Sequence, residues 1–389
     1  MSACGDSIHP KALAVPLRID MNNTGEYDEA LTQIRDYDTC FAEFLKPPGN
    51  GQKIMQAILL REAFSRIVQH GTGVRRDAPT TILDVSCGPG DYSLAWTCEI
   101  ARFLPSGMVF YCTDYPGGVC RATGERYTTA TVRKIDDAAQ RGLLPLSQPA
   151  MGMEADLFSG QDLLMPPGKF ADIIHWSHSG YHVRDALDSR RDDPQAVESG
   201  LNAAMDKMWT ALDESGFMFS VHQTRDLSDG NPSQMLPVSR KYCGALDDVP
   251  ERITTRSEQL GGYIATVNFI SPLMFPELSD AGWEGLKRTR YWNRLDPAQL
   301  RTLQLLNFIA HDFSDPDRAA VEKLAALGRL AEYVDEFRSI VTNNGGHIIV
   351  KCAFQLLSKS REIGICLERV CRELHGEMPE YRREMALVM

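Results

Sequence analysis

From residue 80 onward the chain repeats one pattern: a short, mainly apolar run, a turn of small residues, and a stretch with one apolar face. Short apolar runs of this kind are typical of parallel strands that are covered on both faces. Strand, turn and helix in repeated succession predict an open, doubly wound α/β sheet. The expected strands are ILDV (82–85), MVFYCTD (108–114), one ahead of MEADLF (153–158), ADIIHW (171–176) and GFMFSVHQ (216–223).

The last strands of the sheet are expected towards the C-terminal end. GGHIIVKCAFQL (345–356) reads as the last strong strand, and LKRTRYW (286–292) as its partner in a hairpin. A helix is predicted near residues 273–282, and a large helical insert over 296–340 interrupts the hairpin.

Helical patterns flank the sheet on both sides. GQKIMQAILLREAFSRIV has one apolar face, and REIGICLERVCRELHGEMPEYRREM reads as one amphipathic helix or two. We therefore expect four parts. They are a flexible tail (1–20), a helical cap (21–72), the α/β domain with its lid-like insert (73–357), and a C-terminal helical extension (358–389).

Composition excludes some classes of partner. The formal net charge is −11, so we expect no nucleic-acid partner, and no run is long enough for a membrane-spanning helix. The first twenty residues lack the apolar core of a signal peptide. The ten cysteines show neither C-x-x-C pairs nor zinc spacing, and we expect no metal. Reduced thiols in a cytoplasmic protein are the simplest interpretation.

The stretch TTILDVSCGPGDYS (80–93) ends the first predicted strand in a turn with two glycines. No G-K-[ST] follows, so a P-loop is excluded, and Ser93 stands where a dinucleotide fingerprint has its third glycine. Asp84 and Asp91 flank the turn, and carboxylates repel phosphate. They suit a ligand with an ammonium and a sulfonium centre, such as S-adenosylmethionine (SAM).

Two further acids follow later strands of the predicted sheet. Asp114 ends the second strand, where a carboxylate accepts hydrogen bonds from both ribose hydroxyls of an adenosine. Asp156 follows the third strand, where it can accept from an adenine amino group. Each acid alone also fits a cap or turn residue, but their order along the chain favours a SAM site.

The string D-V-S-C-G-P-G resembles motif I of the class I SAM-dependent methyltransferases, and the pattern extends over about residues 80–223. This resemblance implies a mostly parallel, seven-stranded, Rossmann-like sheet and SAM as the cofactor. The residues it places at the cofactor are Asp84, Ser86, Gly88, Gly90, Asp114, Tyr115, Asp156, Leu157 and His175.

A narrower resemblance is to the histamine N-methyltransferase family, over roughly residues 26–356. It is carried by FADIIHWSHSGYHVRD, TGEYDEALTQIRDYDTCFAEFL, LLNFIAHDF and VTNNGGHIIV. The family's substrate-contacting glutamine falls at His178, and its N-terminal glutamate at Tyr37 or Asp38. Both departures leave histamine itself in doubt, and the residues after Leu357 have no counterpart.

The acceptor is expected beside HWSHSGYHV, because the fourth strand ends next to the SAM methyl. We expect His178 to contact the acceptor as base or orienting group, since its pKa is ordinarily near neutral. Tyr181 is the second catalytic candidate, although a wall of the substrate or adenosine site fits it equally. The other substrate candidates are Tyr37, Asp38, His182, His222, Tyr291, Asn343 and Asn344.

The expected function is thus methyl transfer from SAM to an amine or imidazole nitrogen of a small molecule. The alternative is O-methylation of a small carboxylate or phenol, because TDYP and IHWSHSG also resemble the salicylate-type carboxyl methyltransferases. An alternative of another class is a SAM-binding protein that catalyses cyclisation or acts as a binding module. The sequence identifies neither the acceptor nor the oligomeric state.

Overall fold

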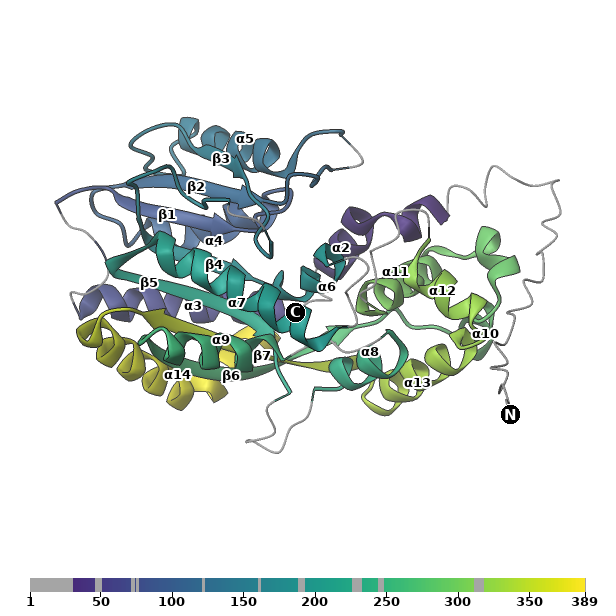
Figure 1. The fold of residues 1–389 in the computed structure, drawn as a ribbon. Coiled ribbons are helices and arrows are strands. Elements are labelled where there is room, and N and C mark those ends of the chain that lie inside the picture. Colours follow the sequence, from purple (N-terminus) through teal and green to yellow (C-terminus); the bar gives the residue numbers. More distant parts are fainter. Residues whose placement is uncertain are drawn as a thin grey trace, which may run out of the picture.

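The computed structural model describes residues 31–45, 51–70, 74, 77–120, 123–159, 162–187, 193–225, 233–243, 248–310 and 318–388. The expected tail (1–20) lies outside these residues. The described chain forms a seven-stranded sheet with helices on both faces and a helical lobe beyond one edge, as Figure 1 shows.

The strand order is β3-β2-β1-β4-β5-β7-β6. Neighbours from β3 to β5 pair in parallel, and β7 pairs antiparallel with both β5 and β6. The expectation of a mostly parallel, seven-stranded sheet is therefore confirmed. The strands are β1 (Thr80–Val85), β2 (Met108–Asp114), β3 (Met151–Glu154), β4 (Ala171–Ser177), β5 (Leu212–Gln223), β6 (Tyr263–Met274) and β7 (His347–Ser358).

Alternation along the strands divides the core between the two faces of the sheet. Ile82 and Ile173 belong to one hydrophobic cluster, whereas their neighbours Leu83 and Ile174 belong to the other. Successive side chains of a strand point to opposite faces of the sheet. A strand in which every residue is apolar therefore needs helices on both faces to bury its side chains. Helices α3, α4, α5 and α14 lie on one face, and α7 and α9 on the other (Figure 1).

The helices that precede β5 along the chain are α2 (Tyr37–Leu45), α3 (Gly51–Gln69), α4 (Asp91–Ala101), α5 (Tyr127–Gln140), η1 (Gly180–His182), α6 (Val183–Ala186) and α7 (Pro194–Ala211). The helices that follow β5 are α8 (Met235–Cys243), α9 (Val249–Gln259), α10 (Asp280–Leu286), η3 (Thr289–Arg294), α11 (Pro297–Ala310), α12 (Ala320–Ala326), α13 (Leu330–Asn343) and α14 (Arg361–Val388).

Two expectations near the C-terminal hairpin are wrong. The partner of β7 is Tyr263–Met274, and the predicted strand 286–292 forms the end of α10 and most of the 3₁₀ helix η3. The buried Trp292 donates its indole N–H to the carbonyl of Leu286 at 3.1 Å, which closes this helical turn. The predicted helix near 273–282 is replaced by the end of β6 and the start of α10.

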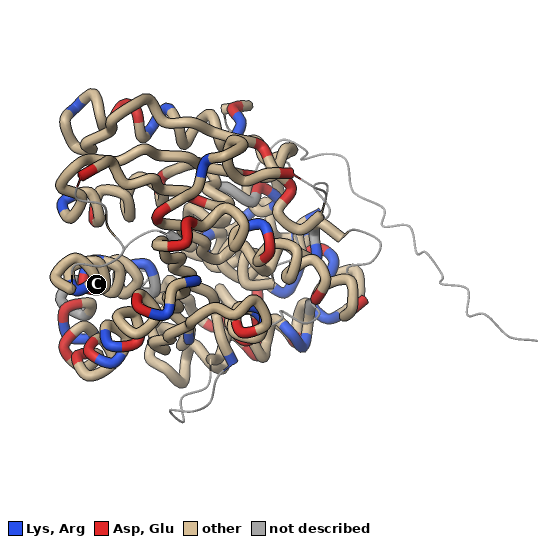
Figure 2. The backbone as a smooth tube through the Cα atoms, turned by 60° about the vertical axis from the view of Figure 1, so that its left-hand side comes forward, with Lys and Arg blue, Asp and Glu red and all other residues tan. Residues whose placement is uncertain are grey.

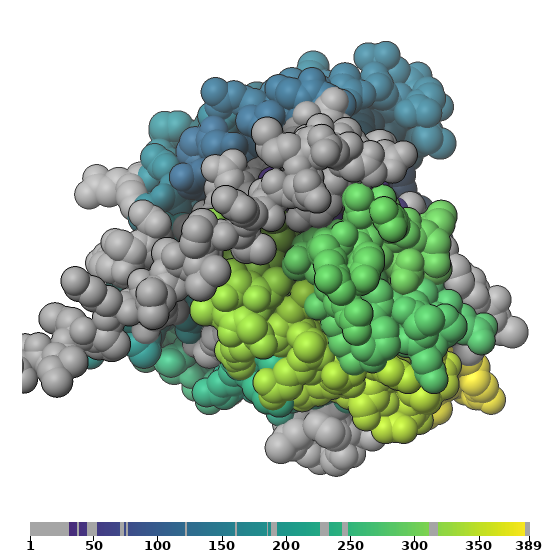
Figure 3. Space-filling model, turned by 90° about the vertical axis from the view of Figure 1, so that its right-hand side faces the viewer, coloured from purple at the N-terminus to yellow at the C-terminus, as the bar shows by residue number. Residues whose placement is uncertain are grey.

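Helices α10 to α13 lie between β6 and β7, a segment that is longer than the expected insert 296–340. It follows β6 after Met274 and returns to β7 at His347, and these two residues pair directly. Gln223, the last residue of β5, pairs with Cys352, so β6 and β7 extend past the carboxyl ends of the parallel strands. They carry the insert beyond the carboxyl ends of these strands, and Figure 3 shows it facing the viewer, below the blue part of the chain that holds β1 to β3.

The C-terminal extension is one helix, α14, packed on α3, β6 and β7. Arg66 of α3 joins them through hydrogen bonds to Glu377 at 2.5 Å and to the hydroxyl of Tyr381 at 3.1 Å. Figure 2 shows acidic and basic residues interspersed around the C-terminus. Within the described residues, no helix is long and apolar enough to cross a membrane.

Candidate active site

The turn after β1 has an unusual backbone. Ser86, Gly88 and Gly90 have φ values of 58°, 56° and 88°, in the left-handed region that favours glycine. A Cβ at Gly90 would lie 2.6 Å from Cα of Thr131, whereas a Cβ at Gly88 would meet no atom within 4 Å. Gly90 is thus required by packing, and Gly88 leaves the backbone open to a ligand. The strained Ser86 marks this turn as a functional candidate.

Asp114, at the end of β2, holds the glycine turn in place. Its Oδ2 accepts from the N–H of Gly88 at 2.7 Å, and its Oδ1 from the N–H of Tyr115 at 2.8 Å. Burial raises the pKa of Asp114 to about 6, although these two bonds and nearby His182 act in the other direction. His182, expected at the substrate, therefore lies within electrostatic reach of this carboxylate.

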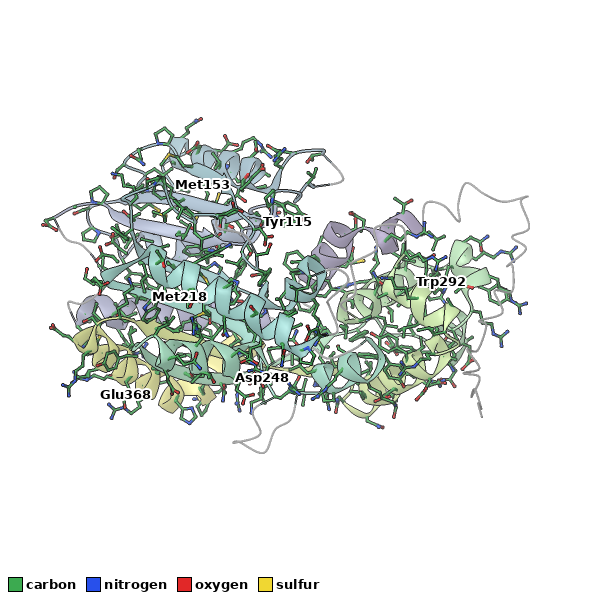
Figure 4. The ribbon with its side chains drawn as sticks, in the orientation of Figure 1. Tyr115, Met153, Met218, Asp248, Trp292 and Glu368 are labelled. Atoms are coloured by element: carbon green, nitrogen blue, oxygen red, sulfur yellow. The ribbon has the colours of Figure 1, made fainter. Side chains whose placement is uncertain are left out.

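Tyr115 follows directly and leaves an open surface beside the turn. It directly follows β2 and is 56% exposed. Figure 4 labels it at the end of β2 that faces the insert. The resemblance places Tyr115 at the cofactor, and this contact stays a prediction.

Asp84 and His175 form a buried pair beneath the turn. Nδ1 of His175 lies 2.6 Å from Oδ1 of Asp84, and the two side chains are 3% and 2% exposed, respectively. Among the described residues, the other carboxylate oxygen and Nε2 have no hydrogen-bond partner. We expected both side chains at the cofactor; the structure shows them sealed from solvent and paired with each other, which favours a supporting role.

His178 has a strained backbone directly after β4. Its φ is 55°, and its N–H donates to the carbonyl of Val221 at 2.9 Å. Left-handed residues other than glycine cluster at functional sites, since the strain must be maintained by the surrounding structure. The half-buried ring lies 6.2 Å from the ring of His222, measured between centroids.

His222 and Tyr181 are built into the core instead of facing a ligand. Nε2 of His222 accepts from the N–H of Gly180 at 3.3 Å, and the side chain is fully buried. Burial, helped by His175 and Lys53, lowers the pKa of His222 to about 3, so it stays neutral. The hydroxyl of Tyr181 accepts from the N–H of Gln223, which favours a positioning role over proton transfer.

Asp156 is used by its own loop. Its Oδ1 accepts from the N–H groups of Phe158 at 3.0 Å and Ser159 at 3.1 Å, while neighbouring Leu157 is buried. This is the turn role that an isolated acid often has. A contact of Asp156 with adenine stays a prediction.

Three substrate candidates in the insert lie apart from this site. Tyr291 is in η3, next to the Trp292 that Figure 4 labels in the outer part of the insert, and the guanidinium of Arg290 lies 4.8 Å from its ring. Asn344, in the turn before β7, donates to Gln234 Oε1 at 2.7 Å, and Asn343 donates to Ser339 Oγ at 3.4 Å within α13. The side chains of Tyr37 and Asp38 lie outside what the structure describes.

Sequence reasoning missed a group from α3 and α4 that reaches this edge of the sheet. Lys53 Nζ lies 3.7 Å from the ring centroid of Tyr92, in the first turn of α4. One turn along α3, Gln56 Nε2 donates to Oγ of Ser177 at 2.8 Å, and Ser177 ends β4 directly before His178. We name Lys53, Gln56, Tyr92 and Ser177 the inner polar cluster. The buried amide of Gln56, placed among apolar neighbours of a helix, was the available signal.

Comparisons with known proteins give the following. No family model matches the chain, and no curated protein matches it. A methyltransferase structure from Bacillus halodurans has 12% identity, a TM-score of 0.38, and coverage of 76% of this chain and 98% of its own. A SAM-dependent methyltransferase from Thiobacillus denitrificans in complex with S-adenosyl-L-homocysteine has 14% identity and a TM-score of 0.33, with 75% of this chain and 90% of that chain covered.

The [4+2]-cyclase SpnF is similar at 15% identity and a TM-score of 0.36, with 78% of this chain and 81% of that chain covered. These likenesses are too distant to assign an activity to this chain.

Proposed function

We propose that this protein transfers a methyl group from SAM to a nitrogen of a small molecule. The observation that carries the proposal is the pairing of Asp114 with the N–H of Gly88. It joins an acid and a glycine turn outside the carboxyl ends of β1 and β2. The strand order reverses beside β1, and such a switch point is where open α/β sheets bind ligands.

The chemistry of these groups fits SAM better than a dinucleotide. A pyrophosphate would sit on the first turn of α4, where Asp91 lies with a carboxylate that is 71% exposed. A negative charge there disfavours phosphate, although Lys134 at 2.6 Å partly offsets it. Asp114 would accept from the ribose hydroxyls, Tyr115 would lie along adenine, and the turn at Ser86 and Gly88 would follow the methionine chain.

On the acceptor side, His178 and the inner polar cluster meet at the end of β4. Methyl transfer is an in-line displacement in which a lone pair of the acceptor forms a bond to carbon while the carbon–sulfur bond breaks. The sulfonium becomes a neutral thioether, and the protein's task is to hold the two reactants in line. A nitrogen acceptor also has to lose a proton, and the imidazole and amine groups here suit that requirement.

Isothermal titration calorimetry with SAM and S-adenosylhomocysteine tests the cofactor site. We expect Asp114→Ala to weaken SAM binding by about 1.5–3 kcal/mol, the range for a lost hydrogen bond to a charged group. Asp91→Ala is the matched control: its exposed carboxylate is paired with Lys134, so its loss should weaken SAM binding much less than Asp114→Ala does. Absence of SAM binding by the wild-type protein would overturn the proposal.

Turnover is tested with panels of small amines, imidazoles, phenols and carboxylates, with S-adenosylhomocysteine detected as product. Product formation with an amine or imidazole supports N-methylation, and formation with carboxylates alone contradicts it. SAM binding without S-adenosylhomocysteine from any acceptor would contradict methyl transfer and favour a non-methylating SAM protein.

A further inference from the structure

Lys53 is placed between the glycine turn and the end of β4. It lies in the first turn of α3, with Nζ over the ring of Tyr92, which follows the glycine turn by two residues. From the same helix, Gln56 reaches Ser177, the residue before His178. The first two turns of α3 therefore connect the two sides of the candidate site, and Lys53 is half-buried between them.

Among the described residues, Asp84 of β1, His222 of β5 and Cys352 of β7 lie within electrostatic reach of Lys53, and Tyr92 of α4 contacts it. His175 of β4 lies against the ring of Tyr92. The strand β6 carries no charged residue. Glu384 and Glu377 of α14 pair with Arg61 and Arg66, which lie two or more turns beyond Lys53 in α3.

Asp84 is the acid among them, and its carboxylate is already bonded to His175. Burial lowers the pKa of Lys53 to about 7, and Cys352 and Asp84 only partly oppose this effect. A sulfonium cation bound beside the turn would disfavour a second positive charge and lower this pKa further. With cofactor bound, the neutral amine is thus the expected form near pH 7, and only this form has a lone pair that can accept a proton.

We propose that Lys53 is the catalytic base of the methyl transfer and that the acceptor enters the site as a protonated nitrogen, an ammonium or an N–H acid. This inference rests on the proposed function and deepens it: Lys53 takes the proton, and His178 orients the acceptor. Nζ forms a bond to the acceptor proton, and the bonding electrons stay on the acceptor atom. That atom then attacks the methyl carbon, and the carbon–sulfur electron pair goes to sulfur.

The reaction balances without any further reagent. A neutral amine, the acceptor and the SAM cation give an ammonium at Lys53, the methylated acceptor and neutral S-adenosylhomocysteine. A carboxylate acceptor has no proton to lose, so it would use Lys53 only as a positive charge. The two roles require opposite protonation states of Lys53, which makes them separable by experiment.

The experiment compares Lys53→Met, Lys53→Arg and Lys53→Ala with wild type, using the acceptor that gives most S-adenosylhomocysteine. For a base, Met and Arg should both lower turnover by about 10²–10⁴-fold, because arginine keeps the charge but does not release a proton near pH 7. The wild-type kcat/KM should rise through about pH 7, and both variants should lose that step. Added ethylamine should restore part of the rate of Lys53→Ala.

The matched control is Lys241→Met. Lys241 lies on α8 and forms ion pairs with Glu332 and Glu336, so this variant should keep the wild-type turnover rate and the wild-type pH profile. SAM affinity by calorimetry and the melting temperature should change little in the Lys53 variants. Lys53→Arg at the wild-type rate, or Lys53→Met with the wild-type pH step, would overturn the base. If either variant result is found while SAM still binds, only the role of Lys53 as base is overturned and the proposed function stands. If the wild-type protein does not bind SAM, the proposed function and the role of Lys53 both fail.

Discussion

Nδ1 of His175 lies 2.6 Å from Oδ1 of Asp84, and both side chains are buried where β1 and β4 pair in register. The rings of Trp96 and Phe219 lie 4.6 and 4.7 Å from the imidazole, measured between centroids. The pair ties the strand before the glycine turn to the strand before His178. It therefore supports both halves of the candidate site from below.

Removing one member of this pair should destabilise the fold strongly. In His175→Phe the carboxylate of Asp84 stays buried without its partner, and we expect a loss of about 3–5 kcal/mol in the free energy of unfolding. Urea denaturation measures it. The double variant Asp84→Leu/His175→Phe should be more stable than the single one, because no unpaired carboxylate remains. A single variant within about 1 kcal/mol of wild type would contradict this account.

Cofactor affinity should depend on the protonation of Asp114. Its raised pKa, about 6, means that the carboxylate is ionised above this pH and protonated below it. The protonated acid is a poorer acceptor for the N–H of Gly88 and for ribose hydroxyls, so SAM affinity should fall as the pH is lowered through about 6. Calorimetry over a pH range that brackets this value measures the change, which Asp114→Asn should lack and Asp91→Asn should retain.

The two glycines of the turn should respond differently to alanine. Gly90→Ala adds a Cβ 2.6 Å from the backbone of Thr131 at a φ of 88°, and it should cost stability by about 1–3 kcal/mol or more. Gly88→Ala meets open space, so it should cost only about 1–2 kcal/mol for the left-handed backbone. It should nevertheless weaken SAM binding at least tenfold by blocking the approach of the ligand. Equal SAM affinity in Gly88→Ala and wild type would place the cofactor elsewhere.

His178→Asn tests the orienting role of His178. Asparagine tolerates the left-handed φ of 55°, so the backbone should keep its conformation. A lost contact to the acceptor should cost about 1–3 kcal/mol, or roughly 5- to 150-fold in kcat/KM. If Lys53 is the base, the pH step persists in this variant; its disappearance would assign the base to His178.

Asn307 should fix the N-terminal helical segment to the insert. Its fully buried amide donates from Nδ2 to the carbonyl of Ile34 at 2.8 Å and accepts at Oδ1 from the N–H of Val321 at 3.2 Å. Asn307→Ala leaves both backbone groups without this partner, and each such loss costs about 1–3 kcal/mol. We expect earlier proteolysis within residues 31–45 as well as lower stability. Unchanged cleavage there would show that the bidentate pair of Arg35 and Glu322 is sufficient.

The candidate site is most predictable where it follows directly from strand ends. A buried run that ends in small residues and acids is a local pattern, and it assigns Gly88 and Gly90 to one turn and Asp114 to the end of the neighbouring strand. The mostly parallel sheet is predictable for the same reason, since its strands are short, apolar and separated by helices.

The hairpin that carries the insert was predicted only in part. The strand Tyr263–Met274 alternates between more and less buried residues, a strand signal that was missed in favour of LKRTRYW (286–292). Its partner lies beyond a long helical segment, so nothing local identifies the pairing. Long-range pairing of this kind is decided when the whole sheet forms, because each strand is stabilised by its neighbours.

The succession of strands, the glycine turn and the acids at the strand ends follow from the amino-acid order, since they depend on residues next to one another in the chain. Folding was needed to bring Lys53 to the ring of Tyr92 and to bury Asp84 against His175. The packing of α3 and α4 on the sheet sets how far each charge is removed from water. Burial, which shifts the pKa values of Lys53, Asp114 and His222, is a property of that packing and is not readable from the residue types alone.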